Sequence, residues 1–401
     1  MKKLILSMAL IGFTTLAFGQ KKVYRAAEKN FKSGNLETAL TEIEAATKDP
    51  ETSGDPATYL LKAKIQTKMF GSDSTNTAEN LEVGKTALAT YLQTAEMAGG
   101  KDSEVGKEVY AEDLLGVPDN LRPYSIFTFK NVAFDKAIDR YNENDLEMAY
   151  SFFDLAGEVD LKDSVIHYNA GFLANDLGKF EEAKRHFGYL LEIPEYNKLN
   201  AYYFMVQILS GEDKNPEGAY DIVMAARKEY PEDKILAEYE IQLLLQLNKM
   251  DDAMASINEA LKTDPNNPSI LLRSGYLKEQ SGDFEGAMAD YMKSVEADPN
   301  YFEGNYYTGA LMLEASRKIL ADLNSLSDTE WEKQSAELGK KADDYYKSSV
   351  PYFTKALEIR PDNTDIMAVL FQVHTRLKNT AEAEKMNKML IEKLGPNWMD
   401  N

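Results

Sequence analysis

The chain has 401 residues, with 66 acidic against 45 basic residues and a formal net charge of −21 at pH 7. Such an acidic surface disfavours binding to phosphate backbones and to anionic membranes. Nucleic acid is therefore not expected as a partner. The absence of cysteine excludes disulfide bonds, thiolate metal sites and thiol nucleophiles.

Residues 1–19 have the pattern of a secretory signal. Lys2 and Lys3 provide a charged start, residues 4–16 are mainly apolar, and residues 17–19 (Ala-Phe-Gly) form a small-x-small cleavage site. The segment resembles signal peptides of envelope proteins in Gram-negative bacteria, which implies export to the periplasm or to the outer-membrane face. A retained N-terminal anchor is the alternative. After cleavage we expect no integral membrane span.

The next region, 20–98, predicts two irregular helix pairs. The first pair covers 23–50, with a turn at Gly34-Asn35; the second has helices over 55–69 and 81–97, separated by a polar loop that begins at Gly71. Glycines at 99–100 and the segment 116–119 then bracket a connection over 99–126 that lacks the helix-pair pattern.

A regular array follows over 127–300. Small residues recur in steps of 34, 36, 34 and 34, which predicts one pair of amphipathic helices per step. These residues are Ala149, Ala183, Ala219, Ala253 and Ala287. A proline closes most of the units: Pro194, Pro231, Pro265 and Pro299.

The unit from Asn267 to Asn300 displays the pattern in full. Gly275 and Ala287 allow two helices to approach closely, Asp283 is placed to cap the second helix, and Pro299 ends it. This arrangement resembles the tetratricopeptide repeat, a 34-residue helix–turn–helix unit. The resemblance implies an all-α fold, a right-handed superhelical solenoid of antiparallel helix pairs. The large aromatic near the start of the first helix is mostly replaced, for example by Ala237 and Leu271.

The unit at 301–361 is longer than the others. Ser349 follows Ala287 after 62 residues, and the extra segment, roughly 316–345, contains a capping-box pattern over 327–330. We therefore expect both helices of this penultimate repeat to be extended into a projecting hairpin. A last repeat covers 362–395, and 396–401 forms a tail.

No motif supports catalysis, and we expect no catalytic residue, cofactor or metal. The segment 80–86 ends like a phosphate-binding loop, but Glu79 occupies the position that requires glycine. The segment 213–218 begins like a calcium loop, but Met224 replaces the glutamate that would complete it. The three histidines, at 167, 186 and 374, are assigned to different units and are interpreted as core or surface residues.

In the tetratricopeptide family, first helices line the concave surface that commonly binds a peptide or a partner helix. By that resemblance, aromatic residues on or beside this surface form a candidate protein-binding groove: Phe134, Tyr141, Tyr168, Phe172, Phe204, Tyr276 and Tyr306. The carboxylates of Glu238 and Glu279 would repel an acidic terminus, so we expect envelope proteins with apolar or basic segments as partners. A scaffold that binds proteins is the main hypothesis. The alternative is a solute- or glycan-binding component of an outer-membrane uptake system.

Overall fold

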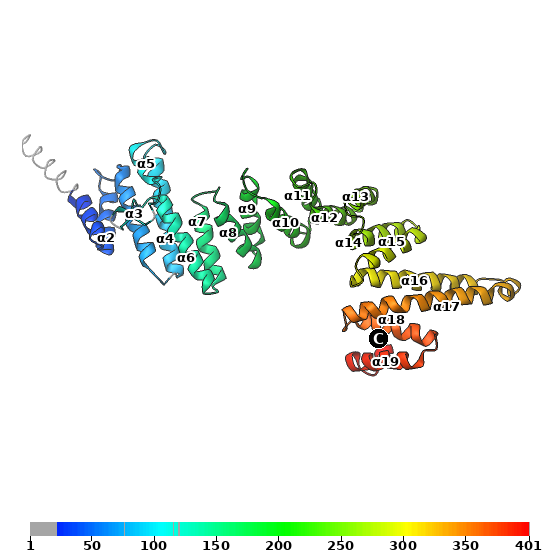
Figure 1. The fold of residues 1–401 in the computed structure, drawn as a ribbon. Helices are drawn as coiled ribbons and strands as arrows, with labels where there is room; N and C mark the ends of the chain where they lie inside the picture. Colours follow the sequence, from blue (N-terminus) through cyan, green and yellow to red (C-terminus); the bar gives the residue numbers. More distant parts are fainter. Residues whose placement is uncertain (1–21, 76, 115, 119–120, 401) are drawn as a thin grey trace, which may run out of the picture. The chain divides into compact units, whose positions relative to one another are not determined.

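The computed structural model describes residues 22–75, 77–114, 116–118 and 121–400. These residues form helices joined by turns, with no β-strand in the described ranges, and the all-α class is confirmed (Figure 1). The chain divides into two compact units, Met1–Asp213 and Lys214–Asn401. The signal peptide expected at 1–19 lies outside the described residues.

The first unit consists of helix pairs and one irregular connection. Its helices are a segment over 22–32, α2 (Leu36–Lys48), α3 (Pro56–Ser72), α4 (Ala78–Met97), α5 (Glu104–Val109), α6 (Ile126–Asn142), α7 (Leu146–Gly157), α8 (Ser164–Asp176), α9 (Phe180–Leu191), α10 (Leu199–Gln207) and the π-helical turn η2 (Ile208–Glu212). The loop expected from Gly71 is wrong by two residues, because α3 continues to Ser72. The side chain of Asn80 donates a hydrogen bond of 3.1 Å to the carbonyl of Phe70, which satisfies a carbonyl in the last turn of α3.

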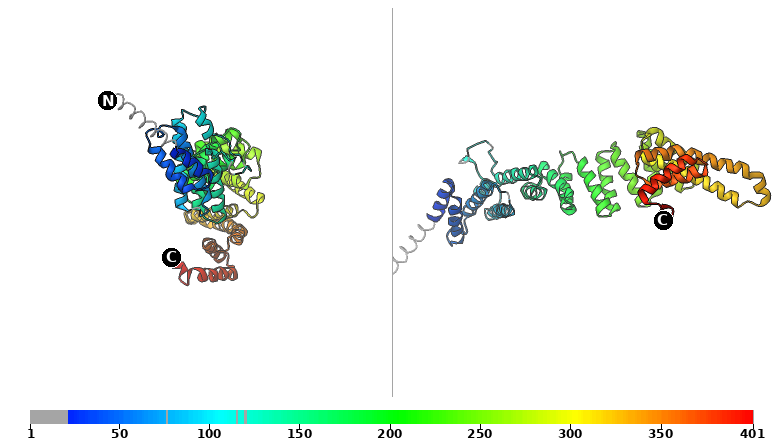
Figure 2. Two further views of the ribbon diagram at one scale, coloured as in Figure 1. Left: turned by 90° about the vertical axis from the view of Figure 1, so that its left-hand side faces the viewer. Right: turned by 90° about the horizontal axis from the view of Figure 1, so that it is seen from below.

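The second unit continues the helix pairs. It contains α11 (Pro216–Glu229), α12 (Lys234–Gln246), α13 (Met250–Thr263), α14 (Pro268–Gln280), α15 (Phe284–Ala297), α16 (Phe302–Asn324), α17 (Asp328–Ile359), α18 (Thr364–Arg376), α19 (Thr380–Leu394) and the short turn η3 (Trp398–Asp400). The expected hairpin is confirmed. Helices α16 and α17 have 23 and 32 residues and lie side by side, and their tip projects past the neighbouring helices (Figure 2). The capping box at Ser327 and Glu330 begins α17 as predicted.

The turn inside most helix pairs has one conformation, which recurs along the chain. A residue with positive φ ends the first helix, and the N–H of the residue after it bonds the carbonyl five residues earlier, as Lys179 does to Ala174 at 2.7 Å and Asp283 to Lys278 at 2.8 Å. The positive-φ residues in these turns are Gly34, Asn144, Gly178, Asn248, Gly282 and Lys378. Glycine, asparagine and, less commonly, lysine are thus accommodated at one turn type. The recurrence of this turn explains why the spacing of the repeats is nearly constant.

Each helix pair is held together by a small residue on one helix facing a large one on the other. The five predicted alanines, from Ala149 to Ala287, are all completely buried. On the first helices, a Cβ added at Gly275 would lie 2.5 Å from the ring of Tyr291, and one added at Gly171 would lie 2.9 Å from Phe187. The small residues of the repeat are therefore required by close packing and not by backbone conformation.

This packing predicts opposite effects for two glycine-to-alanine substitutions in the second unit. Gly275→Ala is expected to lower the free energy of unfolding by about 2 kcal/mol, because the buried Tyr291 ring must move. Gly339→Ala on α17 is the matched control, since its Cβ meets nothing within 4 Å, and it is expected to raise stability by up to about 1 kcal/mol. Urea denaturation followed by circular dichroism measures both. Equal effects of the two substitutions would contradict this account of the packing.

Candidate protein-binding surface

Three of the seven predicted groove residues are exposed aromatic side chains on first helices. Tyr141 on α6 is 47% exposed, Phe172 on α8 is 39% exposed, and Tyr276 on α14 is 37% exposed. The first two belong to the first unit and Tyr276 to the second. Exposed aromatic side chains can lose much apolar area on binding while few rotatable bonds are fixed, so these three positions can anchor a partner.

The other four predicted residues are half-buried and contribute to the core. Phe204 on α10 stacks on Phe187 with ring centroids 4.7 Å apart. Phe172 and Phe204 pack edge to face with ring centroids 6.2 Å apart. Tyr168 stacks on Phe172 at 6.5 Å, so α8 and α10 present a continuous aromatic strip. Phe134 packs edge-on against Phe153 at 5.6 Å, and Tyr306 contacts Phe353 at 6.1 Å. Assignment of all seven to a binding groove stays a prediction.

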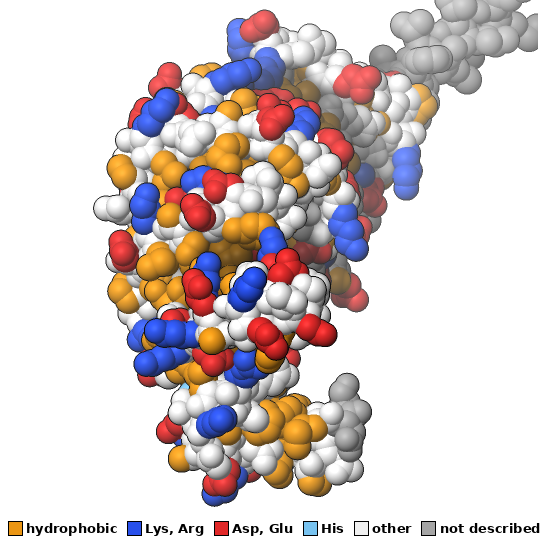
Figure 3. Space-filling view, turned by 90° about the vertical axis from the view of Figure 1, so that its right-hand side faces the viewer, with side chains coloured by type: hydrophobic (Ala, Val, Ile, Leu, Met, Phe, Trp, Pro, Cys, Tyr) orange, Lys and Arg blue, Asp and Glu red, His pale blue; other side chains and the backbone are white. Residues whose placement is uncertain are grey.

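A second apolar surface lies beneath the projecting hairpin in the second unit. A cavity of about 480 Å³ is lined by residues of α15, α16 and α17, among them Phe284, Ile319 and Tyr345. The Nζ of Lys318 lies 5.2 Å from the centre of the Phe284 ring. Figure 3 shows hydrophobic side chains interspersed with basic and acidic residues on the face seen from the hairpin side. Sequence analysis did not identify this cavity, because it forms only where the extended helices overhang α15.

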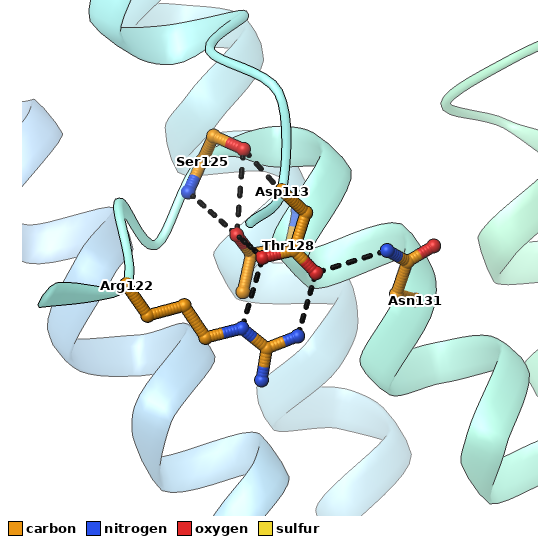
Figure 4. A network of polar contacts seen from close by, with 5 residues as sticks. All are labelled: Asp113, Arg122, Ser125, Thr128 and Asn131. Carbon is orange, nitrogen blue, oxygen red and sulfur yellow. Dashed lines mark hydrogen bonds and ion pairs between the residues drawn. The ribbon is translucent and has the colours of Figure 1, made fainter. Parts of the chain in front are cut away.

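The connection before α6 is anchored by the carboxylate of Asp113. This side chain, 2% exposed, accepts bonds from Arg122 Nε at 2.9 Å and Arg122 Nη2 at 2.6 Å (Figure 4). It also accepts from Thr128 Oγ1 at 2.8 Å and from Asn131 Nδ2 at 2.9 Å. These donors hold the pKa of Asp113 at about 2, below its ordinary value of 3.8. Ser125 caps α6 in the same network through a reciprocal bond with Thr128.

Arg122 also borders a polar cavity of about 560 Å³ in the first unit. Lys136, which also lines this cavity, is buried and donates a 2.6 Å bond to the carbonyl of Asp73. Burial and the neighbouring Asp139 raise the pKa of Asp135, which also lines the cavity. The cavity thus combines cationic and carboxylate groups, a lining suited to a polar solute.

The assignment of the three histidines to different units is wrong for two of them. His167 on α8 and His186 on α9 belong to one helix pair, and their Nδ1 atoms lie 3.0 Å apart in the buried interior. The antiparallel turn at Gly178 brings together residues that are distant in sequence. His186 Nε2 lies 3.2 Å from Asp154 Oδ1, whereas His167 Nε2 is buried with no hydrogen-bond partner among the described residues.

The first weak motif lies inside α4, and the second spans the turn before α11 and the first residues of that helix. Gly84 lies inside α4, where an added Cβ would contact Phe70 and Leu155 at 2.9 Å, so the glycine serves helix packing. Asn215 caps α11 by accepting a bond of 2.9 Å from the N–H of Gly218. In the part of the chain that the structure describes, no acidic and histidine side chains cluster in a group of three that could hold a metal ion. No described helix is long and apolar enough to cross a membrane.

Comparison with known proteins agrees with the helix pairs. The tetratricopeptide repeat family model matches residues 242–267 and 268–301. The structure is similar to YrrB, described as a TPR protein with an unusual peptide-binding site (20% identity, 44% of this chain and 90% of that chain, TM-score 0.37). It is also similar to a tetratricopeptide repeat protein from Parabacteroides merdae (17% identity, 73% of this chain and 98% of that chain, TM-score 0.31). A third similar structure is pilF of Pseudomonas aeruginosa (13% identity, 66% of this chain and 91% of that chain, TM-score 0.35). No curated protein matches the chain.

The matched residues contain α13, α14 and α15, which share their turn conformation and close-packed small residues with the other helix pairs. This arrangement defines a class, the α-helical repeat proteins. Within that class, residues 242–301 match the tetratricopeptide repeat family model.

Proposed function

We propose that the protein is a non-catalytic scaffold that binds protein partners through the first helices of its repeats. The exposed aromatic residues Tyr141, Phe172 and Tyr276 carry this proposal, because each lies on a first helix and leaves a large apolar side chain in solvent. A repeat fold supplies an extended surface of such positions, and recognition through shape and pockets needs no reactive group. The residues 1–19 support export, so we propose the periplasm or the outer-membrane face as its location and envelope proteins with apolar or basic segments as partners.

The double substitution Phe172→Ala with Tyr276→Ala tests the surface. We expect capture of the partner from envelope extracts to fall by at least tenfold, since each truncation removes an aromatic anchor of about 1–2 kcal/mol. Affinity capture with quantitative mass spectrometry measures the effect, and circular dichroism should show unchanged helicity.

Met292→Ala is the matched control, because Met292 is an equally exposed apolar residue (37%) on a second helix. Capture should be unchanged in this variant. Full capture by the double variant would discard the two anchors, and recovery of the partner only from cytoplasmic extracts would discard the proposed location.

A solute-binding role is the second candidate, and the polar cavity beside Lys136 favours it. Glycans or polar solutes that raise the melting temperature of the protein would support this role. The effect should then be lost on Lys136→Met.

A further inference from the structure

The projecting hairpin of α16 and α17 carries an exposed tryptophan at its tip. Trp331, near the start of α17, is 49% exposed. Helix α17 packs against α16 and α18, and the tip extends past the neighbouring helices (Figure 2). A large aromatic side chain in this position loses much apolar area when it is covered, so it can anchor a contact outside its own chain.

A line of apolar side chains joins this tryptophan to the cavity at the base of the hairpin. Trp331, Leu338 and Tyr345 follow one another at intervals of seven residues, and positions seven apart lie within about 20° of each other around a helix. Leu338 and Tyr345 are half-buried, and Tyr345 lines the cavity of about 480 Å³. The other apolar residues of the lining are Phe284, Met288, Leu311, Ala315 and Ile319. An exposed anchor and an apolar cavity thus lie on one face of α17, about 21 Å apart along the helix.

The two ends of this face differ in charge. At the base, the segments 314–318 and 337–341 contain four basic and two acidic residues, and the exposed Lys318 and Lys341 line the cavity. At the tip, residues 325–332 contain three exposed acidic residues and no basic residue. The cavity lining also includes carboxylates, those of Glu285, Glu314 and Asp322. Apolar contact therefore supplies the affinity of this face, and the charge difference between its ends sets the direction in which it pairs.

We propose that two copies of the protein associate through their hairpins in antiparallel orientation, with Trp331 of each copy in the cavity beside Phe284 of the other. A two-fold axis passes near Leu338, midway between Trp331 and Tyr345 in the sequence, so both ends of the face are covered at once. Parallel pairing would place the three tip carboxylates against the same three carboxylates. A second copy fits because one chain carries both the anchor and the cavity. The proposed first-helix surface takes no part in this contact.

Sedimentation velocity of the full-length protein over a range of concentrations tests the proposal. We expect an equilibrium between monomer and dimer, and a dissociation constant at least tenfold higher for Trp331→Ala with unchanged helicity. Ile235→Ala is the matched control, because Ile235 on α12 is an equally exposed apolar residue (51%) that lies outside the hairpin. Its dissociation constant should equal that of the unchanged protein.

Charge reversal separates docking from a loss of structure. Asp328→Lys with Glu332→Lys reverses the tip, Lys318→Glu with Lys341→Glu reverses the base, and each double variant alone should dimerise at least tenfold more weakly. An equimolar mixture of the two double variants should form heterodimers with nearly the affinity of the unchanged protein. One contact then keeps its original charges and the other has both signs reversed.

A cysteine near the axis reports the orientation of the two hairpins. The chain contains no cysteine, so Leu338→Cys introduces a single thiol that should form a disulfide between copies on mild oxidation. Ala336→Cys is the control, because residues two apart point about 160° apart around a helix, and it should stay unlinked.

A protein that sediments as a monomer at every concentration would overturn the proposal. Dimers that survive both Trp331→Ala and the charge reversals would overturn it as well. Equal cross-linking of the two cysteine variants, or a mixture that fails to associate, would refute antiparallel pairing. If Trp331→Ala instead reduces capture of a different protein by a monomeric chain, the tip binds that protein and a second copy is excluded.

Discussion

Replacement of Asp113 by alanine is expected to lower the free energy of unfolding of the first unit by about 3 kcal/mol. The carboxylate is almost completely buried and accepts four hydrogen bonds from Arg122, Thr128 and Asn131. Its removal leaves the partly buried Arg122 guanidinium without its hydrogen-bonded carboxylate and two neutral donors without an acceptor. Urea denaturation followed by circular dichroism measures the loss.

The same substitution should loosen one particular region. Residues 104–142 contain α5, the connection and α6, and hydrogen exchange in this segment is expected to accelerate before exchange elsewhere in the first unit. Glu181→Ala provides the control, because Glu181 forms an ion pair with Lys184 at a position 82% exposed, and it should change stability by less than about 0.5 kcal/mol. Equal effects of the two substitutions would show that the Asp113 network does not anchor the connection.

The pH dependence of this network has a definite sign. The pKa of Asp113 is about 2 in the folded protein and 3.8 in its ordinary range, so the unfolded chain takes up the proton first as the pH falls. The contribution of Asp113 to stability is therefore complete above pH 4 and is lost between about pH 4 and pH 2. It should not change the stability near neutral pH.

The repeats could be predicted from the sequence because their determinants are local. Ala149 and its equivalents recur at a nearly constant step, and a buried position on an amphipathic helix follows from spacing alone. The hairpin could be predicted for the same reason, since an insertion that preserves helical periodicity and begins with a capping box lengthens the helices on both sides of it.

The polar networks could not be predicted because they depend on contacts without a sequence period. Asp113 lies in the irregular connection, and its donors follow 9, 15 and 18 residues later on two different elements. Nothing in the order of these residues indicates that they converge on one carboxylate.

The candidate site could be predicted only in part. Tyr276 was identified from its position on a first helix, but Tyr307, which lines a cavity of the second unit together with Tyr276, was passed over in favour of its neighbour Tyr306. Consecutive residues point about 100° apart around a helix. Tyr307 therefore lines the cavity, whereas Tyr306 contacts Phe353 in the core.

The histidine pair predicts a pronounced loss of stability in mild acid. Burial, and secondarily the neighbouring His186, lower the pKa of His167 from 6.5 to about 4, against a weaker opposing effect of Asp160 and Asp163. The two Nδ1 atoms are 3.0 Å apart, so one of them must remain unprotonated to accept the bond. The folded protein therefore resists a proton that the unfolded chain accepts readily.

This difference fixes the pH range and the direction of the effect. The unfolded chain binds a proton at His167 as the pH falls through 6.5, and the folded protein does so only near pH 4. The free energy of unfolding should thus decrease by up to about 3 kcal/mol between pH 6.5 and pH 4, and this group should add no further loss below that range. The Asp113 network does not interfere, because it titrates at lower pH.

His167→Asn isolates the effect, because asparagine retains a donor toward His186 and cannot titrate. The difference in urea midpoint between pH 7 and pH 4.5 should be smaller in this variant than in the unchanged protein. His374 provides the control: burial also lowers its pKa, but it lies on α18 in the second unit, and His374→Asn should leave the acid response of the first unit intact. If His167→Asn keeps the full acid response, other groups cause it, and the buried pair is a neutral packing contact over this pH range.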